Sequence, residues 1–284
     1  MIRDDVMKKL EEVGDLPTLS AVVVKLNKML NDENVNAEDI GKLIADDVSI
    51  MSKVLRTVNS SAYGLSREVE SIAQAVSMLG EKGVRNIAMS ASAVSAFDIK
   101  SSGGFDIDEF WKHSISVGIA MNVLYEKVEN PPKISKDMLH LCGLMHGIGI
   151  LTLVQYFFIK FVMSMRISQN KNIGLCEAEK QVLDIDHCEI GAWLANKWQL
   201  PEGIVNVIRY HSNPEESPED DLLVNLAHTA VYICRKNDLG KYGGGNAQFY
   251  NHIWKKLGFG VSDIPVFVKE IKTKVSESEL FDLI

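Results

Sequence analysis

Five of the seven histidines in this chain stand where a helix would carry them on its apolar face. His113, for example, follows Phe110 by three residues and precedes Val117 by four, the spacing of neighbours along one side of a helix. Comparable spacing to apolar residues holds for the other four, His146, His187, His211 and His228. Each imidazole is therefore expected to point inward, and five imidazoles from five helices could share one polar pocket.

Inward imidazoles support two interpretations. Neutral ring nitrogens ligate divalent transition metals, so the set of five predicts a site for zinc, nickel or iron, although the fold need not require a metal. The alternative is a core in which each ring nitrogen is hydrogen-bonded, as buried polar groups usually are. A metal held by this set should dissociate as the pH drops below about 6 to 6.5, because a protonated imidazole cannot be a ligand.

The elements that must position these histidines are helices almost throughout. Asn36 can cap a helix whose apolar residues, Ile40 and Ile44, recur at a spacing of four. A further amphipathic helix begins near Ile72 and is expected to end at Gly80. No two-residue alternation is bounded by hairpin signals, so the sequence predicts an all-α fold without a sheet.

Three polar, glycine- or proline-containing segments interrupt this pattern and predict long loops near residues 100–106, 212–221 and 240–248. The first of them suggests a division into an N-terminal helical lobe, residues 1–100, and a second helical lobe, residues 101–284.

Composition limits the kinds of partner. The chain has 284 residues and a net charge of −8, so it offers no overall basic field for nucleic acid or for an anionic membrane. No glycine-rich segment follows a strand, which excludes a dinucleotide or P-loop site. The apolar stretch from Ile148 to Met163 contains Gln155 and Lys160, and it is expected to be too short and too polar to span a bilayer.

The four cysteines are scattered through the chain and form no CxxC pair. This favours reduced thiols over a disulfide framework or a thiolate metal site. No apolar segment of a signal peptide follows Met1. Both features predict a cytoplasmic location.

A series of short motifs runs in a recognisable order. The N-terminal part contains Leu16-Pro17-Thr18-Leu19, Ile44-Ala45-Asp46-Asp47, Val54-Leu55-Arg56-Thr57-Val58-Asn59-Ser60, Tyr63-Gly64 and Ile72-Ala73-Gln74-Ala75. The second part contains Phe110-Trp111-Lys112-His113, the turn Gly143-Leu144-Met145-His146-Gly147-Ile148-Gly149, Gly191-Ala192-Trp193-Leu194, Trp198-Gln199-Leu200-Pro201 and Ile208-Arg209-Tyr210-His211. Together they resemble the HDOD domain, the HD-related output domain of bacterial signalling proteins, over roughly residues 10 to 235.

The resemblance implies an HDOD-like bundle in which the N-terminal lobe packs on a degenerate HD-like lobe. In catalytic HD proteins the metal ligands run His, His-Asp and a late Asp. His113 and His146 match the first two positions, Gly147 replaces the aspartate of the pair, and His228 replaces the late aspartate. His187 and His211 match histidines that two-metal relatives add.

Two carboxylates that would bridge metal ions and shape a nucleophile are thus absent, and no catalytic residue is predicted. The resemblance implies a non-catalytic signal-transduction module that binds a signalling protein or a small signalling ligand, without nucleic acid or membrane partners. The alternative is a metal-dependent phosphohydrolase acting on a nucleotide or cyclic dinucleotide. The oligomeric state is left open.

Overall fold

The chain folds into helices, as the periodicity predicts. The computed structural model describes residues 2–29, 36–61, 63–65, 67–218, 221–240, 245–278 and 280–281. Within these residues there is no strand, and an isolated bridge joins Ser102 to Phe105. The predicted all-α class is confirmed.

Five helices form the N-terminal part: α1 (Ile2–Glu12), α2 (Ala21–Met29), α3 (Ala37–Ala45), α4 (Val48–Asn59) and α5 (Ile72–Ser95). Asn36 caps α3 as expected, because its side chain accepts hydrogen bonds from the backbone N–H groups of Glu38 and Asp39. Gly80 ends the first helical segment of α5, as the sequence predicts, and a second segment continues beyond it. This glycine has a φ of 76°, which only glycine adopts easily, and it forms a break inside the longer α5.

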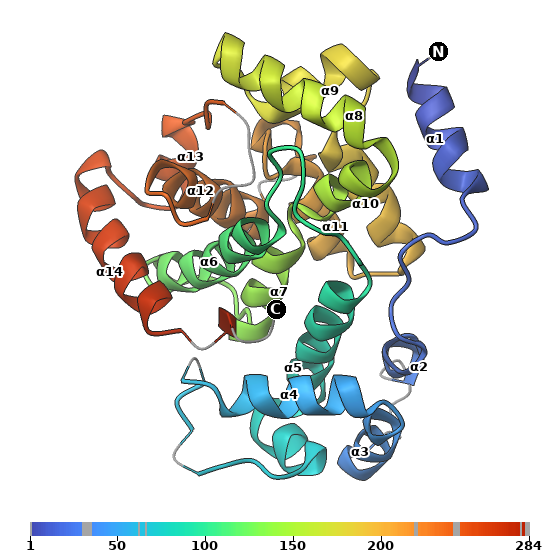
Figure 1. Cartoon of the computed structure of the whole chain (residues 1–284). Helices are drawn as coiled ribbons and strands as arrows, with labels where there is room; N and C mark the ends of the chain where they lie inside the picture. The colour runs from blue at the N-terminus through green and yellow to red at the C-terminus, as the bar shows by residue number, and fades with distance from the viewer. Residues whose placement is uncertain are drawn as a thin grey trace.

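The remaining helices form the second part: α6 (Ile107–Tyr125), α7 (Lys136–Met145), α8 (Ile148–Lys171), α9 (Leu175–Leu183), α10 (His187–Lys197), α11 (Glu202–Tyr210), η1 (Pro214–Glu216), α12 (Leu222–Lys236), α13 (Asn251–Lys256), η2 (Val261–Asp263) and α14 (Ile264–Ser276). Figure 1 shows α2 to α5 gathered at one end of the molecule and α8 to α11 at the other, with α6 and α7 between them.

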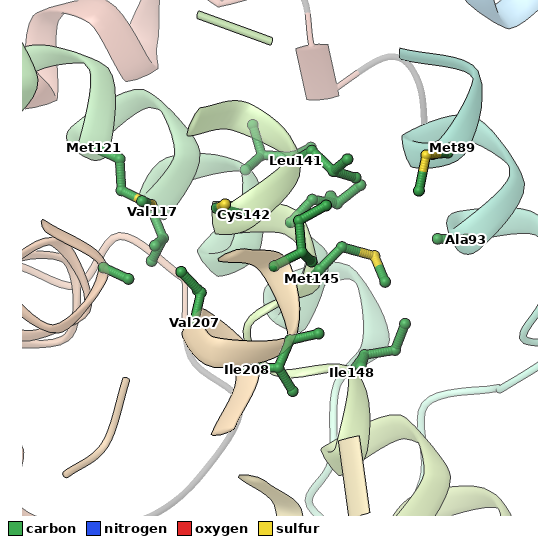
Figure 2. Close-up of a cluster of buried hydrophobic side chains, with 14 of the residues drawn as sticks. Met89, Ala93, Val117, Met121, Leu141, Cys142, Met145, Ile148, Val207 and Ile208 are labelled. Atoms are coloured by element: carbon green, nitrogen blue, oxygen red, sulfur yellow. The ribbon is translucent and has the colours of Figure 1, made fainter. Parts of the chain in front are cut away.

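Helix α7 is the centre of the core. Its apolar side chains Leu141, Cys142 and Met145 are buried among residues of α5, α6, α8 and α11, as Figure 2 shows. Although α7 is short, it contacts α5, α6 and α11 at once. It therefore fixes how the two parts of the chain pack together.

Two pairs of glycines let backbones cross at close range. A Cβ on Gly143 of α7 would lie 2.2 Å from the backbone nitrogen of Gly118 in α6. A Cβ on Gly149 of α8 would lie 1.9 Å from the carbonyl oxygen of His187 and 2.7 Å from the backbone nitrogen of Gly191, both in α10. Only glycine allows these approaches, and they place the α7–α8 turn between α6 and α10.

Helix α1 packs on the second part of the chain, well away from α2 to α4 (Figure 1). Arg3 forms an ion pair with Glu189 of α10 at 3.1 Å, and the Tyr156 hydroxyl of α8 donates to the carbonyl of Asp15 at 2.9 Å. The division into lobes at residue 100 stays a prediction.

Non-helical segments occur where long loops were expected. Residues 97–106 connect α5 to α6, and the segment after α11 contains the short helix η1. Part of the two later predicted loops, residues 219–220 and 241–244, lies outside the described residues. A further connection between α4 and α5, near residues 60–71, was not anticipated.

The apolar segment around α8 is longer than the stretch that the sequence analysis judged too short to span a bilayer. Residues Lys136–Lys171, which span α7 and α8, are long and apolar enough by length and composition to cross a membrane. However, 61% of the most apolar 18-residue stretch of this segment is buried inside the fold. Its apolar character is therefore accounted for by core packing.

We predict that Gly149→Ala destabilises the protein severely. The added methyl group would meet backbone atoms of α10 that cannot rotate away, so the free energy of unfolding should fall by at least about 3 kcal/mol. Gly174→Ala is the matched control, because a Cβ there has nothing within 4 Å, and its cost should stay within about 1 kcal/mol. Urea unfolding followed by circular dichroism measures both, and equal stabilities would contradict the close-crossing argument.

Candidate functional site

Four of the five predicted histidines form a row through the interior. The ring centroids of His113 and His146 are 5.4 Å apart, those of His146 and His211 are 4.9 Å apart, and those of His211 and His187 are 5.7 Å apart. These side chains come from α6, the α7–α8 turn, the end of α11 and the start of α10, and all four are buried. The close backbone crossings bring the segments of His113, His146 and His187 together, and α11 packs against α7 and α10.

His228 of α12 joins the row from the side. Its Nδ1 lies 2.8 Å from the carbonyl oxygen of His211, and its ring stacks against Tyr250 with a centroid distance of 5.1 Å. All five histidines singled out from the sequence therefore lie in one region. Their role as metal ligands stays a prediction.

Backbone carbonyls fix the orientation of these rings. Nδ1 of His146 lies 2.6 Å from the Gly143 carbonyl oxygen, and Nδ1 of His211 lies 3.1 Å from that of Ile208. A carbonyl can only accept, so Nδ1 carries the proton and Nε2 keeps its lone pair. Nε2 of His146 and Nε2 of His228 are buried and have no hydrogen-bond partner among the described residues. Such nitrogens suit a ligand or a metal ion.

Burial keeps most of this cluster neutral. It lowers the pKa of His146 and of His228 to about 4 and lowers those of His113 and His211 well below the ordinary value. The charge of neighbouring imidazoles adds to this effect for His113, His146 and His211. Neutral imidazoles are the form in which histidine binds metals.

His187 is the exception, because it is paired with a buried carboxylate. Oε2 of Glu179, in α9, accepts hydrogen bonds from Nδ1 of His187 at 2.6 Å and from its backbone nitrogen at 2.9 Å. Burial alone would lower the pKa of His187, but anionic neighbours raise it well above its usual range. A hydrogen bond with Cys188 and burial raise the pKa of the Cys176 thiol, and burial also raises the pKa of Glu179, so Glu179 and His187 share a proton across their hydrogen bond.

Two cysteines lie beside this pair, which the sequence interpretation did not anticipate. Sγ of Cys176 lies 3.5 Å from Sγ of Cys188 and 3.6 to 3.7 Å from the two ring nitrogens of His187. Among the described residues, Cys176, His187 and Cys188 are the group whose potential ligand atoms all lie within 4.8 Å of one another. Sequence spacing did not predict this contact, since α9 and α10 pack together and bring residues twelve positions apart next to each other.

An open cavity of about 540 Å³ lies against this part of the cluster. Its wall includes Cys176, His187, Cys188, His211 and His228. That volume suits a small ligand of ordinary size.

Charged groups line the same cavity. Arg209 and Arg235 contribute positive charge, while Lys180 is paired with Asp186 at 3.0 Å. Glu177 and Glu216 also line the wall. The lining is therefore mixed in charge.

The positions of the missing aspartates have other neighbours. A Cβ on Gly147 would lie 3.2 Å from a ring carbon of Phe110, so this position faces an apolar ring. His228 occupies the second position and uses Nδ1 to bond the His211 carbonyl. Neither Gly147 nor His228 therefore provides a carboxylate.

Comparison with known proteins identifies the family of this fold. The HDOD domain profile matches residues 16–214. A protein of Treponema pallidum (strain Nichols), described only as an uncharacterized protein, is 27% identical over 210 residues, which is 74% of this chain and 40% of that protein. The chain therefore spans less than half the length of this curated relative.

Solved structures share the fold at low identity. An HDOD domain protein of unknown function from Geobacter sulfurreducens superposes with a TM-score of 0.74 and 22% identity, over 97% of this chain and 94% of that one. A Shewanella amazonensis protein, provisionally named a phosphohydrolase, gives a TM-score of 0.73 and 21% identity over 98% and 97% of the two chains. A Marinobacter aquaeolei protein, provisionally named a signal transduction protein, gives 0.76 and 20% identity over 97% and 64%. The resemblance inferred from the motifs is confirmed.

We predict that the lowered pKa of His228 makes stability sensitive to acid. Below a pH of about 6.5 the unfolded chain binds a proton at this residue, whereas the folded protein does not until about pH 4. The free energy of unfolding should therefore fall with decreasing pH across this window, by up to about 1.4 kcal/mol per pH unit from this group.

The comparison with His228→Gln isolates this contribution in metal-free protein. His187 and Glu179, whose pKa values are raised, contribute slopes of the opposite sign in both proteins and cancel in the difference. Urea unfolding at several pH values from 7 to 4.5 measures the two slopes. Parallel slopes would show that His228 does not titrate abnormally in the folded protein.

Proposed function

The chain belongs to the HDOD domain family, and from that premise we propose that it is a non-catalytic signal-transduction module of a bacterium. It acts by binding a small signalling ligand or a partner signalling protein, and it does not hydrolyse what it binds. The single observation that carries this proposal is the loss of both metal-bridging carboxylates from a cluster whose histidines are still in place.

The chemistry of the remaining groups supports binding without turnover. Hydrolysis of a phosphate ester by metal ions needs a ligand that bridges or charges the ions and a group that activates water. Glu179 is a carboxylate buried at the cluster, but its Oε2 is held by two hydrogen bonds from His187. The four neutral imidazoles supply no negative charge.

The cavity beside the cluster supports the binding part of the proposal. It has room for a small organic ligand, and Arg209 is exposed at its wall, where it can meet an anionic group. The proposal includes a divalent transition metal, zinc, nickel or iron, bound at the histidine cluster without being required for the fold. Buried Nε2 atoms of His146 and His228 support this part.

A cytoplasmic location is also proposed. All four cysteines are free thiols, and two of them lie close enough to meet yet remain unbonded. Reduced thiols suit a reducing compartment.

We predict no phosphodiesterase activity. Purified protein with added manganese should not turn over nucleoside phosphates or cyclic dinucleotides, because neither Gly147 nor His228 supplies a carboxylate. Product formation measured by chromatography tests this. Turnover that His146→Ala abolishes, with the variant still folded, would replace the proposal by the alternative of a metal-dependent phosphohydrolase.

Binding is tested separately, by equilibrium dialysis with labelled nucleoside phosphates and cyclic dinucleotides as probes. Saturable binding that Arg209→Ala weakens at least about tenfold, without turnover, supports a ligand-binding module. The control is Arg166→Ala, a substitution on α8 away from the cavity wall. Absence of binding by every probe would instead favour the partner-protein form of the proposal.

A further inference from the structure

The group formed by Cys176, His187 and Cys188 has the dimensions of a metal site. Zinc lies about 2.3 Å from thiolate sulfur and about 2.0 to 2.1 Å from imidazole nitrogen, so tetrahedral geometry separates two sulfurs by about 3.8 Å and a sulfur from a nitrogen by about 3.6 Å. The observed Sγ–Sγ distance is 3.5 Å, and Sγ of Cys176 lies 3.6 to 3.7 Å from the nitrogens of His187. Two of the three edges of such a site are therefore close to the required lengths, and the third, from Cys188 to His187, is within 4.8 Å.

We propose that Cys176, His187 and Cys188 bind one zinc ion, with the fourth coordination position open to the cavity. This ligand set shares only His187 with the five-histidine set and is a separate site. Two soft thiolates and an imidazole select zinc over harder cations such as magnesium or calcium.

Glu179 supplies the orientation that such a site needs. A metal-bound histidine typically donates its second ring N–H to a carboxylate, which fixes the tautomer and the direction of the ring. His187 Nδ1 makes this contact with Glu179 Oε2 at 2.6 Å, inside the protein and away from solvent. Zinc binding would displace the proton on Nε2 of His187 to solvent, so Nε2 is the ligand atom, and Glu179 is a positioning residue.

The fourth position points to water or to a small ligand. All three ligand residues line the 540 Å³ cavity, so a metal ion there would be accessible from it. A zinc ion with three protein ligands and one open position exchanges a bound water for other ligands. His211, whose ring nitrogens lie 3.9 and 4.0 Å from Cys188 Sγ, is the nearest imidazole outside the set.

The same cysteine pair suggests a competing outcome. Two sulfurs 3.5 Å apart can also be joined into a disulfide by a two-electron oxidant. The experiment must therefore separate a reduced, metal-bound pair from an oxidised one.

The test uses the full chain without a histidine tag, purified under reducing conditions. We expect about one equivalent of zinc by elemental analysis. Replacement by cobalt(II) should give a sulfur-to-cobalt charge-transfer band in the near ultraviolet and the intense visible bands of tetrahedral cobalt. Cys176→Ala and Cys188→Ala should each lose the charge-transfer intensity in part and weaken zinc binding at least about tenfold. Cys142→Ala is the matched control, because that thiol is buried in α7 outside the group, and it should keep the full spectrum.

A further variant tests whether Glu179 orients His187 for zinc binding or only stabilises the fold. Glu179→Gln keeps the size of the side chain but removes the carboxylate, and we expect zinc affinity to fall about 10- to 100-fold while the sulfur band remains. Unchanged affinity would assign Glu179 a merely structural role and remove the support it gives to the site. Circular dichroism checks that each variant is folded.

Three results would overturn the proposal. The first is metal content well below one equivalent after incubation of reduced protein with zinc. The second is bound metal without a sulfur band, abolished by His146→Ala, which would place the ion in the histidine row. The third is protein that was purified under reducing conditions but whose mass is lower by two hydrogens and whose Cys176 and Cys188 do not react with an alkylating reagent. That result would assign the pair to a disulfide.

Discussion

The close crossing of backbones at Gly118–Gly143 and Gly149–Gly191 is the constraint on which the rest of this structure depends. At both crossings a single added Cβ would lie within atomic contact of a neighbouring backbone. The turn between α7 and α8 is thereby held between α6 and α10, and His146 lies between His113 and His211. Without these glycines the helices would have to move apart by about 1 Å before a Cβ reached ordinary contact distance, and the histidine row would lose its spacing.

This packing holds the histidines in place without a bound ion. The positions of the histidines are set by helix crossings and by hydrogen bonds from Nδ1 to backbone carbonyls, and neither depends on a metal ion. Gly147 faces the ring of Phe110, so the position where the resemblance would place an aspartate borders an apolar ring. Neutral imidazoles fit this environment because burial lowers their pKa, and the cluster is stable in the interior without a balancing anion.

Periodicity could predict the fold and the inward direction of all five histidines, because the face of a helix follows from local spacing alone. It could not predict the meeting of Cys176 and Cys188. These residues belong to different helices, and the angle between α9 and α10 depends on tertiary contacts that a single sequence does not reveal. Cys188 directly follows His187, and this adjacency was the one local signal of a mixed thiol and imidazole site. The helix end at Gly80 could be predicted, but the second helical segment of α5 beyond it could not, because its direction depends on the packing of α5 against α3, α4 and α7.

Charge balance distinguishes the two places where this protein can hold a metal. A divalent ion among neutral histidines would bring two uncompensated positive charges into a buried region, at a large cost in solvation. Cys176 and Cys188 would supply two negative charges as thiolates, and Glu179 adds a third behind His187. The thiolate group also borders the open cavity, where water can screen what charge remains. The histidine row offers neutral ligands alone, whereas the neighbouring cysteine pair would supply negative charge by losing its thiol protons as an ion binds, and this is the physical reason to expect the tighter binding at the edge of the histidine cluster.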